Sequence, residues 1–528
     1  MHRFQVVIVG GGPVGVALAV ELGLRGISCA LVERHLAPQR IPKGQNLTQR
    51  TLEHFYFWGI VDELRAARLL PPGYPIGGVT AYESLMSDYW FARGGREVVR
   101  SYYFQDNDRL PQYLMEEVLR ARLADFPHVT RLFGWSAERI EQDDRGVRIT
   151  IAEVRGSESQ VLEAEYAVGC DGARSTVRDQ LGIDRGGADF GERMVLAVFR
   201  SRELHEGLKR FPERTTYRVL HPDLKGYWQF FGRVDVGQGW FFHAPVPPDS
   251  TPENYDFHGL LQRAAGFSFS CALDYVGFWD LRIAIASRYR QGRVFIAGDA
   301  AHSHPPYGGF GLNSGLEDVV NLGWKLAAAL NGWGGDDRLL DSYGEERRPI
   351  FVETGEAMIA GGIEADRAFL ERFSPHRDPA EFEQAWQQLA ATSGSRQQSY
   401  EPHYEGSSVV AGPQNAVCSI QGRHAFAAQA GHHLAPQPLS SGRNVFEELG
   451  TGFTLLAFGA DNRAVQAFQH AALSVRAPLH VIRDSFVGER TAYAARMLLV
   501  RPDQYVVWAG DEPPQDTAAL FHTVIGTR

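Results

Sequence analysis

The sequence predicts a mixed α/β and α+β fold: a parallel-sheet domain, an inserted antiparallel sheet, and a small α/β domain at the C-terminus. Residues 4–9 and 27–33 are apolar, strand-like runs on either side of a helical pattern, as in a βαβ unit. Residues 186–286 contain short aromatic runs separated by Gly, Pro and Asp, which is typical of antiparallel strands. Two further strand-like runs, 453–458 and 498–510, flank helical sequence.

The composition is that of an ordinary globular chain. Its 528 residues are 44% hydrophobic and 22% charged, enough for about two to four domains. The formal net charge of -10 argues against a nucleic-acid-binding surface, which normally needs a basic patch. No apolar run approaches the roughly 20 residues of a membrane span, and no secretory signal opens the chain, so we expect a cytoplasmic protein. The four cysteines form no CxxC pair and no metal-ligand spacing, so no metal site is predicted.

The first chemical motif follows the first strand-like run. Gly10, Gly12 and Gly15 form a GxGxxG pattern, and Pro13 and Val14 open the helix behind it. Glycines let the backbone turn sharply and approach a pyrophosphate, while the helix N-terminus offers free N–H groups to it. The motif therefore predicts a dinucleotide-binding turn.

An acid at the end of the second strand completes this pattern. Glu33 follows Gly15 by 18 residues, the distance at which a carboxylate reaches a ribose hydroxyl. Arg34 follows directly and is assigned to the same cofactor. Strand, helix, second strand and acid together predict a Rossmann-like domain, but they do not separate NAD from FAD.

Two later segments do separate these cofactors. Residues 169–178 read GCDGARSTVR, and residues 293–302 read RVFIAGDAAH, followed by a glycine-rich loop. With the GxGxxG pattern, these segments resemble the three fingerprints of the class A FAD-dependent aromatic hydroxylases, which have a p-hydroxybenzoate-hydroxylase-like fold. The resemblance covers residues 4–350 well and continues more weakly to the C-terminus, as in the phenol and polyketide hydroxylase branch.

The resemblance implies a non-covalent FAD. Asp299 matches the aspartate that hydrogen-bonds the ribityl chain, and Asp171 matches the acid of a DG motif tied to flavin and nicotinamide handling. Lys43 stands where the family often has an arginine near the pyrophosphate, and Gln112 matches a glutamine of the diphosphate–ribityl region. Further cofactor contacts are expected from Pro305, Gly311, Leu312 and Asn313.

The segment after the third fingerprint supports a flavin site on physical grounds. Ser314 and Glu317 form a capping box, which predicts that a helix begins there. The glycine-rich loop 308–313 would then deliver backbone N–H groups to a helix N-terminus. Reduced flavin is anionic at one edge, and such a terminus stabilises that charge.

Other polar residues near these motifs have simpler interpretations. We expect His302 and His304 to pack or hydrogen-bond rather than act as bases. We expect Arg347 and Arg348 to lie on a charged surface helix.

Strand alternation in the aromatic region predicts candidate substrate residues. Gln229 and Phe231 share one face of a strand, as do Phe241 and His243. One such face is expected to line a substrate pocket.

The sequence offers only a few candidate catalytic residues. Gln45 and Asn46 align near a substrate-side polar position of the family. Both are neutral amides, so removal of a phenol proton is assigned to His243 or a water chain, with Gln45 as a second catalytic candidate.

The resemblance implies a monooxygenase that consumes NADPH or NADH and O2. It would hydroxylate a phenolic or other electron-rich aromatic substrate through a flavin C4a-hydroperoxide. The alternative is a non-hydroxylating flavoprotein on the same scaffold, of reductase or halogenase type or one that shelters a reactive intermediate.

The C-terminal region resembles the thioredoxin-like domain of phenol and polyketide hydroxylases. It contains only Cys418, which excludes thiol–disulfide chemistry there, so we expect it to serve packing or homodimer formation. The predicted domains are FAD-binding (1–75, 106–185 and 287–375), substrate-binding β-sheet (76–105 and 186–286), linker (376–400) and thioredoxin-like without CxxC (401–528).

Overall fold

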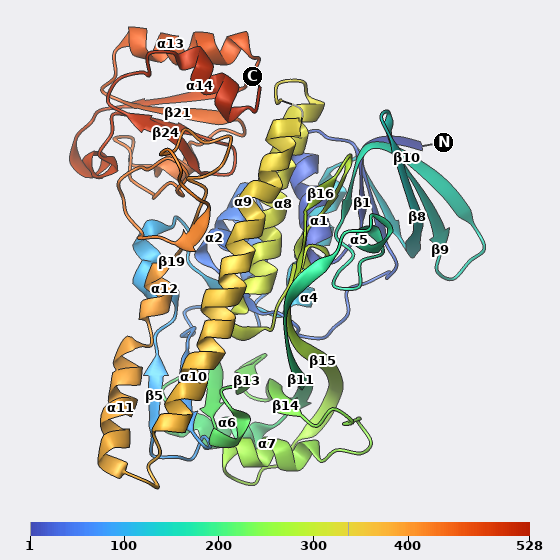
Figure 1. The fold of residues 1–528 in the computed structure, drawn as a ribbon, viewed down its shortest axis with the longest axis vertical. Coiled ribbons are helices and arrows are strands. Elements are labelled where there is room, and N and C mark those ends of the chain that lie inside the picture. Colours follow the sequence, from blue (N-terminus) through green and yellow to red (C-terminus); the bar gives the residue numbers. More distant parts are fainter. Residues whose placement is uncertain (1, 336, 528) are drawn as a thin grey trace.

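The structure is a computed structural model that describes residues 2–335 and 337–527. Two long helices, α8 (Phe310–Leu330) and α9 (Asp337–Glu353), run through its middle (Figure 1). One sheet lies beside them, a second lies at one end, and the C-terminal domain packs at the other end. Within the described residues, no helix combines the length and the apolar character needed to cross a membrane.

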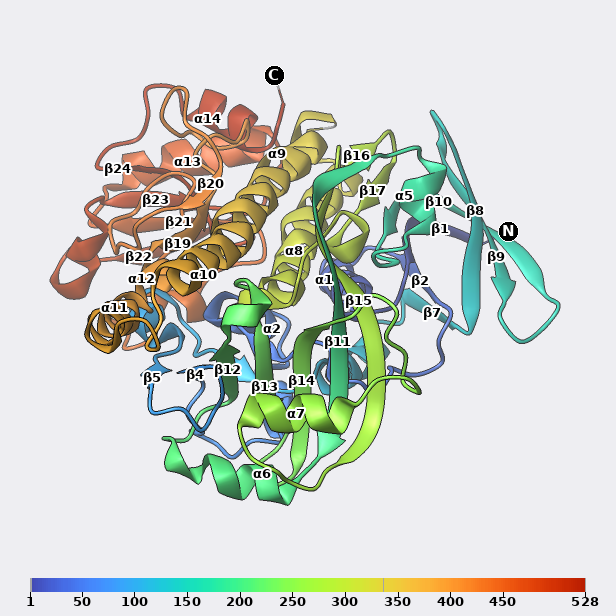
Figure 2. The same ribbon diagram turned by 60° about the horizontal axis from the view of Figure 1, so that its bottom comes forward.

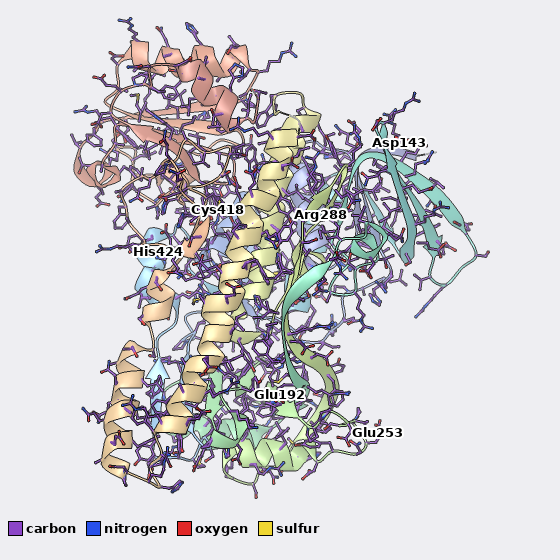
Figure 3. The ribbon with its side chains drawn as sticks, in the orientation of Figure 1. Asp143, Glu192, Glu253, Arg288, Cys418 and His424 are labelled. Atoms are coloured by element: carbon purple, nitrogen blue, oxygen red, sulfur yellow. The ribbon has the colours of Figure 1, made fainter. Side chains whose placement is uncertain are left out.

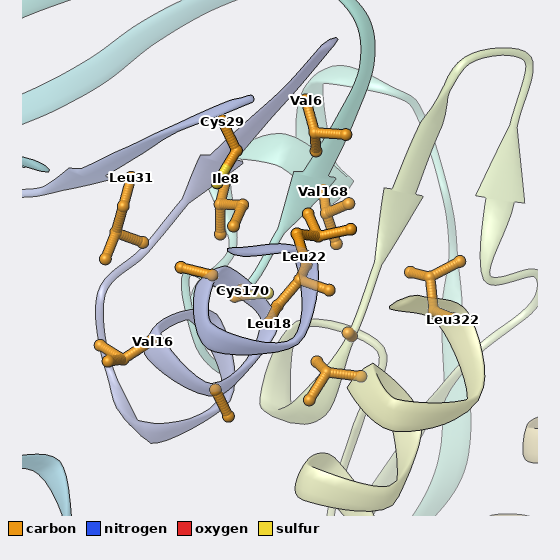
Figure 4. Packing of buried hydrophobic residues seen from close by; sticks show 14 of the residues in the cluster. Val6, Ile8, Val16, Leu18, Leu22, Cys29, Leu31, Val168, Cys170 and Leu322 are labelled. Atoms are coloured by element: carbon orange, nitrogen blue, oxygen red, sulfur yellow. The ribbon is translucent and has the colours of Figure 1, made fainter. Parts of the chain in front are cut away.

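The first sheet contains the predicted βαβ unit. Its strands, in spatial order, are β16 (Arg290–Gln291), β17 (Val294–Ile296), β10 (Ser159–Gly169), β1 (His2–Val9), β2 (Cys29–Glu33) and β7 (Val129–Phe133), while β9 (Gly146–Glu153) and β8 (Trp135–Asp143) extend it from β10. β1 pairs in parallel with β2 and β10, and α1 (Pro13–Leu24) joins β1 to β2. Ile8, Leu18 and Cys29 are buried in one core between strands and helix (Figure 4), as expected for a parallel sheet covered by helices.

Shorter helices complete this domain. They are α2 (Gln49–Phe57), α3 (Val61–Ala66), α4 (Gln112–Arg122) and α5 (Thr176–Gln180). A small ladder, β3 (Asn46–Leu47) with β6 (Asp108–Arg109), joins the segment before α2 to the segment before α4. It brings two distant parts of the chain to one edge of the domain.

Helix α8 begins earlier than predicted. It starts at Phe310, so Ser314 and Glu317 lie inside the helix and the predicted capping box is wrong. The reason is the left-handed backbone of Gly308 and Gly309, with φ of 74° and 70°, which turns the chain into the helix before Ser314 is reached. The glycine-rich loop still precedes a helix N-terminus, now a turn upstream.

The second sheet is the inserted aromatic region. Its order is β18 (His302–Ser303), β15 (Ala272–Ala286), β11 (Arg185–Arg200), β14 (Gly239–Val246), β13 (Gln229–Arg233), β12 (Thr216–Leu220), β4 (Gly78–Tyr82) and β5 (Trp90–Arg93). Helices α6 (Arg202–Gly207) and α7 (Phe257–Ala265) cover one face (Figure 2). β4 joins the sheet by parallel pairing with β12, so residues far apart in sequence form one surface.

The segment 376–400, predicted to be a linker, contains two helices. It follows α10 (Gly361–Arg372) and forms α11 (Pro379–Thr392) and α12 (Ser395–Ser399). The Asp378 side chain caps α11, and Phe382 and Trp386, one helical turn apart, are buried against Tyr82 of the second sheet. Polar composition suggested a linker, but this apolar i,i+4 pair behind a capping residue was the informative signal.

The C-terminal domain has a sheet of its own, ordered β22 (Leu479–Asp484), β21 (Phe453–Phe458), β23 (Met497–Val500) and β24 (Val506–Gly510). β21 and β22 are parallel and joined by α13 (Asn462–Ser474); β23 and β24 are antiparallel and precede α14 (Thr517–Val524). The pair β19 (Tyr400–His403) and β20 (Ser419–Gln421) leads into it. Cys418 and His424 lie in this connecting region beside the central helices (Figure 3).

Candidate active site

The three fingerprint segments meet at the carboxyl edge of the first sheet. Gly10 has φ of 102°, and a Cβ on it would lie 2.4 Å from the Cys170 carbonyl oxygen, in the second fingerprint. A Cβ on Gly298, in the third fingerprint, would lie 2.8 Å from Cγ2 of Val14. Glycine at both positions is therefore required by close backbone packing.

The N-terminus of α1 is open. Gly12 is its N-cap, Pro13 stands at the first helical position, and no described side chain caps it. A Cβ on Gly12 would meet no described heavy atom within 4 Å. Uncapped N–H groups facing open space at a helix N-terminus form a binding place for a phosphate group.

Glu33 lies beside this turn. One carboxylate oxygen accepts the Gly11 N–H at 2.7 Å, and the other accepts the His35 N–H at 2.7 Å. Each carboxylate oxygen accepts more than one hydrogen bond, so Glu33 keeps capacity for a ribose hydroxyl. The side chains of Arg34 and Lys43 are exposed.

Asp299 is an accessible carboxylate at the end of the third fingerprint. In the described part of the chain it accepts no hydrogen bond. Desolvation by the surrounding protein raises the pKa of Asp299, while electrostatic interaction with His302, Arg185 and Lys43 opposes that shift. A carboxylate without a partner in such a position fits a ligand hydroxyl.

Asp171 is already engaged. It accepts the Ser175 hydroxyl at 2.5 Å and the Val177 N–H at 3.1 Å, and burial raises its pKa. Its carboxylate therefore holds the loop of the second fingerprint against the start of α5.

Asn313 holds the loop before α8. Its Oδ1 accepts the Thr48 N–H and the Thr51 hydroxyl, and its Nδ2 donates to the carbonyl oxygens of Asn46 and Gly309. These four bonds use the full capacity of the amide. The side chain positions the cofactor loop, and only the backbone N–H remains for a ligand.

The segment before β3 contacts two further predicted residues. A Cβ on Gly44 would lie 3.2 Å from Oε1 of Gln112 and 3.3 Å from Cδ2 of Leu312. Gln112 also donates to Glu116 at 2.8 Å. Gln112 and Leu312, far apart in sequence, thus border the same place.

A cavity of about 510 Å³ lies next to the start of α8. Its wall includes Tyr307 and Phe310 from the glycine-rich loop and Phe230 from the second sheet. Tyr307 stacks on Trp228 with ring centroids 4.6 Å apart. This size and aromatic lining suit a ligand of a few fused rings.

The predicted substrate residues divide between the two faces of the second sheet. Gln229 and Phe231 share a face, as predicted, but Phe231 is fully buried in the core beneath α6 and α7. The cavity wall takes Phe230 from the opposite face. The structure thus does not place Gln229 and Phe231 at the cavity, because the helices cover their face.

Phe241 and His243 lie on the same face of the second sheet as Phe230. They belong to the neighbouring strand β14 and are not part of the cavity wall. The guanidinium of Arg109 lies over Phe241, 5.7 Å from its centroid. His243 is buried among aromatic rings, which lowers its pKa to about 4. An imidazole with that pKa is a weak proton acceptor.

The amides Gln45 and Asn46 differ in position. Asn46 lines the cavity and accepts a hydrogen bond from Arg109. Gln45 is buried, and its Nε2 has no partner among the described residues.

Arg347 is buried, contrary to the predicted surface position. It donates to Asp318 Oδ1 at 2.8 Å and to the Tyr404 hydroxyl at 3.0 Å. His302 has the predicted structural role, since it bonds Asp318 Oδ2 at 2.5 Å and stacks on Phe351. Asp318 thereby holds the third fingerprint to α9.

Comparisons with known proteins agree with this geometry. Residues 3–356 match the family model described as FAD binding domain, and residues 427–527 match the one described as aromatic-ring hydroxylase, C-terminal. A Streptomyces halstedii protein described as a polyketide hydroxylase is 31% identical over 100% of this chain and 97% of its own.

Two further known proteins also align with this chain over nearly the full length of both chains. The 4-methyl-5-nitrocatechol 5-monooxygenase of a Burkholderia species is 29% identical over 98% of this chain and 96% of its own. The solved structure of the flavin-dependent monooxygenase PieE with FAD and substrate is 26% identical, with a TM-score of 0.85 over 100% of this chain and 99% of that one. The chain therefore belongs to the FAD-dependent aromatic-ring hydroxylases, a family of flavoprotein monooxygenases.

Proposed function

We propose that this enzyme hydroxylates a phenolic or polycyclic aromatic substrate bound in the 510 Å³ cavity, with NAD(P)H and O2 as co-substrates. One observation carries the proposal. The segment Tyr307–Phe310 forms part of the cavity wall and leads directly into the N-terminus of α8. An aromatic ring in the cavity would therefore meet a flavin ring held at that terminus.

The residues around the site have distinct roles in this proposal. The turn from Gly10 to Gly15 would hold the FAD pyrophosphate, Glu33 a ribose hydroxyl, and Asp299 the ribityl chain. FAD supplies the oxygen-transfer chemistry when bound. The backbone N–H groups at the start of α8 would stabilise negative charge on the reduced ring.

Phe230, Trp228 and Tyr307 of the cavity wall present aromatic surface to the substrate ring. His243 is a weak base behind this wall, so we assign removal of the phenol proton to water in the cavity.

The names of the relatives favour oxygen insertion over the reductase, halogenase or sheltering alternative. Two finer points stay predictions: the choice between NADPH and NADH, and a homodimer through the C-terminal domain.

Oxygen insertion is tested with 18O2. Purified enzyme, NADPH or NADH and a panel of hydroxynaphthalenes and hydroxyanthraquinones are incubated under 18O2, and products are analysed by mass spectrometry. We expect one 18O atom in the product. NAD(P)H oxidation that yields only H2O2 with every compound contradicts the proposal.

The purified protein is expected to be yellow, with FAD bound non-covalently. The reason is the convergence of the open α1 terminus, Glu33 and Asp299 on one site. Acid precipitation should leave all flavin in the supernatant, where chromatography identifies it as FAD. Flavin that stays with the precipitate would show a covalent link.

Asp299→Ala is expected to weaken FAD binding about ten- to a hundredfold, because a hydrogen bond to a charged acceptor contributes about 1.5–3 kcal/mol. Titration of the apoprotein, followed by flavin fluorescence, measures the Kd. Asp144→Ala, at an exposed turn, is the matched control and should bind FAD as the parent does. An unchanged Kd for a folded Asp299→Ala variant would remove Asp299 from the cofactor site.

A further inference from the structure

A cluster of two histidines and two glutamates lies at the end of β19, outside the cofactor and substrate sites (Figure 1). Glu401 and His403 belong to β19, Glu405 follows two residues later, and His432 comes from the segment between β20 and the C-terminal sheet. All four residues are buried or half-buried. The cysteine pattern predicted no metal site, and this cluster contains no cysteine.

His432 is at the centre of this cluster. Its Nδ1 lies 2.7 Å from Oε1 of Glu401, and its Nε2 lies 2.9 Å from Oε1 of Glu405. Among the described side chains, no lysine or arginine pairs with either carboxylate. The two acids therefore concentrate negative charge around one imidazole.

His403 packs against this imidazole. The rings of His403 and His432 are stacked, with centroids 4.6 Å apart and planes inclined by 7°. His403 is only 7% exposed, and its buried Nδ1 has no hydrogen-bond partner among the described residues. Burying a polar nitrogen without a partner is unfavourable. A bound ion would supply the partner that this nitrogen lacks.

The spacing of the polar atoms suits a metal ion. A ring nitrogen of His403, a ring nitrogen of His432 and a carboxylate oxygen of Glu405 lie within 4.8 Å of one another. Around a tetrahedral Zn²⁺ with bonds of about 2.1 Å, the ligand atoms are about 3.4 Å apart. Rotation of the stacked His403 ring about its Cβ–Cγ bond, a torsion with broad minima, would bring its nitrogen to the ion. The Glu405 side chain is 26% exposed, which leaves a path from solvent.

The backbone holds the segments that carry these groups. Tyr404, between His403 and Glu405, donates its N–H to the Gly431 carbonyl oxygen at 2.7 Å. The Val506 N–H donates to the His432 carbonyl oxygen at 2.9 Å. The two segments are thus tied to each other and to β24 by hydrogen bonds that do not depend on an ion.

Glu401 has the position of a carboxylate that orients a metal-bound imidazole. Such a carboxylate accepts the N–H of one ring nitrogen and leaves the other nitrogen free to bind the ion. Glu401 lies at Nδ1 of His432, so Nε2, which faces Glu405, is the nitrogen available for an ion.

We propose that His403, Glu405 and His432 bind a Zn²⁺ ion and that Glu401 orients His432. Two histidines, one glutamate and a water molecule form a ligand set that Zn²⁺ uses in proteins. The carboxylates of Glu401 and Glu405 balance the charge of the ion.

The position of the site indicates a structural role for the ion. It would hold β19 to the segment of His432, whose neighbour His433 binds Glu53 of α2 at 2.8 Å. The ion would therefore stabilise the junction between the C-terminal region and the FAD-binding domain. Zn²⁺ would act there independently of the oxygen chemistry at the flavin.

Metal content and affinity test the site directly. The FAD-loaded enzyme, prepared without a histidine tag, is treated with EDTA, and Zn²⁺ is titrated in against a chromophoric chelator of known affinity. We expect about one Zn²⁺ per chain, with a Kd at or below about 1 μM. A protein that takes up no Zn²⁺ under these conditions would overturn the proposal and leave His432 as an imidazolium between two carboxylates.

Variants then locate the ligands. His432→Gln and Glu405→Gln should each weaken Zn²⁺ binding at least about a hundredfold, and Glu401→Gln about ten- to a hundredfold. Because the Glu405 side chain is partly exposed, Glu405→Gln tests the site even where His432→Gln lowers stability. His470→Gln, at an exposed histidine on α13, is the matched control and should bind Zn²⁺ as the parent does. Equal affinity in all four variants would place the ion elsewhere and contradict the assignment.

X-ray absorption spectroscopy identifies the ligand atoms. The zinc-loaded enzyme should show only nitrogen and oxygen ligands, at about 2.0–2.2 Å. A sulfur ligand at about 2.3 Å would indicate a site built on a cysteine and would overturn the assignment.

Discussion

Glu346→Gln is expected to destabilise the protein by about 3–5 kcal/mol, the cost of breaking a buried ion pair by removing one partner. The Glu346 carboxylate is fully buried in α9. It accepts both Nη atoms of Arg501, at 2.7 and 2.8 Å, and Nζ of Lys325 at 2.8 Å. Glutamine keeps the shape but removes the carboxylate that pairs with Lys325 and one of the two carboxylates that pair with Arg501.

Urea unfolding measures this effect. Glu345→Gln changes the exposed neighbour on the same helix and should alter stability by less than about 0.5 kcal/mol. A loss below about 1 kcal/mol for Glu346→Gln would show that the ion pairs contribute little beyond their hydrogen bonds.

The pH dependence gives a second measurement. Burial raises the pKa of Glu346, but Arg501 and Lys325 outweigh it and hold the pKa well below its usual range. The stabilisation is therefore full above the unfolded value of about 4.3 and is lost as the pH falls towards the folded pKa. The difference in the free energy of unfolding between the parent protein and Glu346→Gln should become smaller below about pH 4.

This cluster also explains how the C-terminal domain is held. Arg501 follows β23 and binds both Glu346 of α9 and Asp503 of its own loop. Arg50 of α2 donates to the Asp503 carbonyl oxygen at 2.6 Å and also bonds Glu317 of α8. The domain therefore packs through buried charge onto the helix whose first turn borders the cavity.

The cofactor half of the site was predictable because its requirements are local. A tight turn next to a parallel strand needs glycine at Gly10, and a ribose needs an acid at the end of the next strand, where Glu33 stands. The ranges 4–9 and 27–33 are apolar because both faces of their sheet are covered. Each requirement is written within a few tens of residues.

The other features of the site could not be predicted from the sequence, because they depend on contacts between residues far apart in the chain. Arg347 looks like a surface residue in its own helix, and its burial is made favourable by Asp318, Tyr404 and the Ser314 carbonyl oxygen, all distant in sequence. Alternation put Phe231 and Gln229 on one face correctly, but the helices that cover that face decide which side is the cavity.

Binding of a true substrate is expected to raise the rate of flavin reduction by NAD(P)H at least about tenfold. Reduction without substrate would waste the reductant as H2O2. A ligand shifts a conformational equilibrium only by its difference in affinity for the two states, and about 3 kcal/mol gives roughly a hundredfold. Gly308 and Gly309 border both the cavity and the start of α8, so a ligand in the cavity contacts the loop that would move with the flavin ring.

Anaerobic stopped-flow reduction, with and without ligand, measures the gain, and a glycine pair tests the loop. Gly309→Ala places a Cβ 3.2 Å from Asn46 at φ of 70°, so it should strain the loop and reduce the stimulation. Gly332→Ala has φ of 72° with no described atom within 4 Å; it carries the same backbone cost away from the cavity and should keep the full stimulation. Equal reduction rates with and without every ligand of the phenol panel would instead describe an ungated reductase. Equal stimulation in the two variants would place the gate outside this loop.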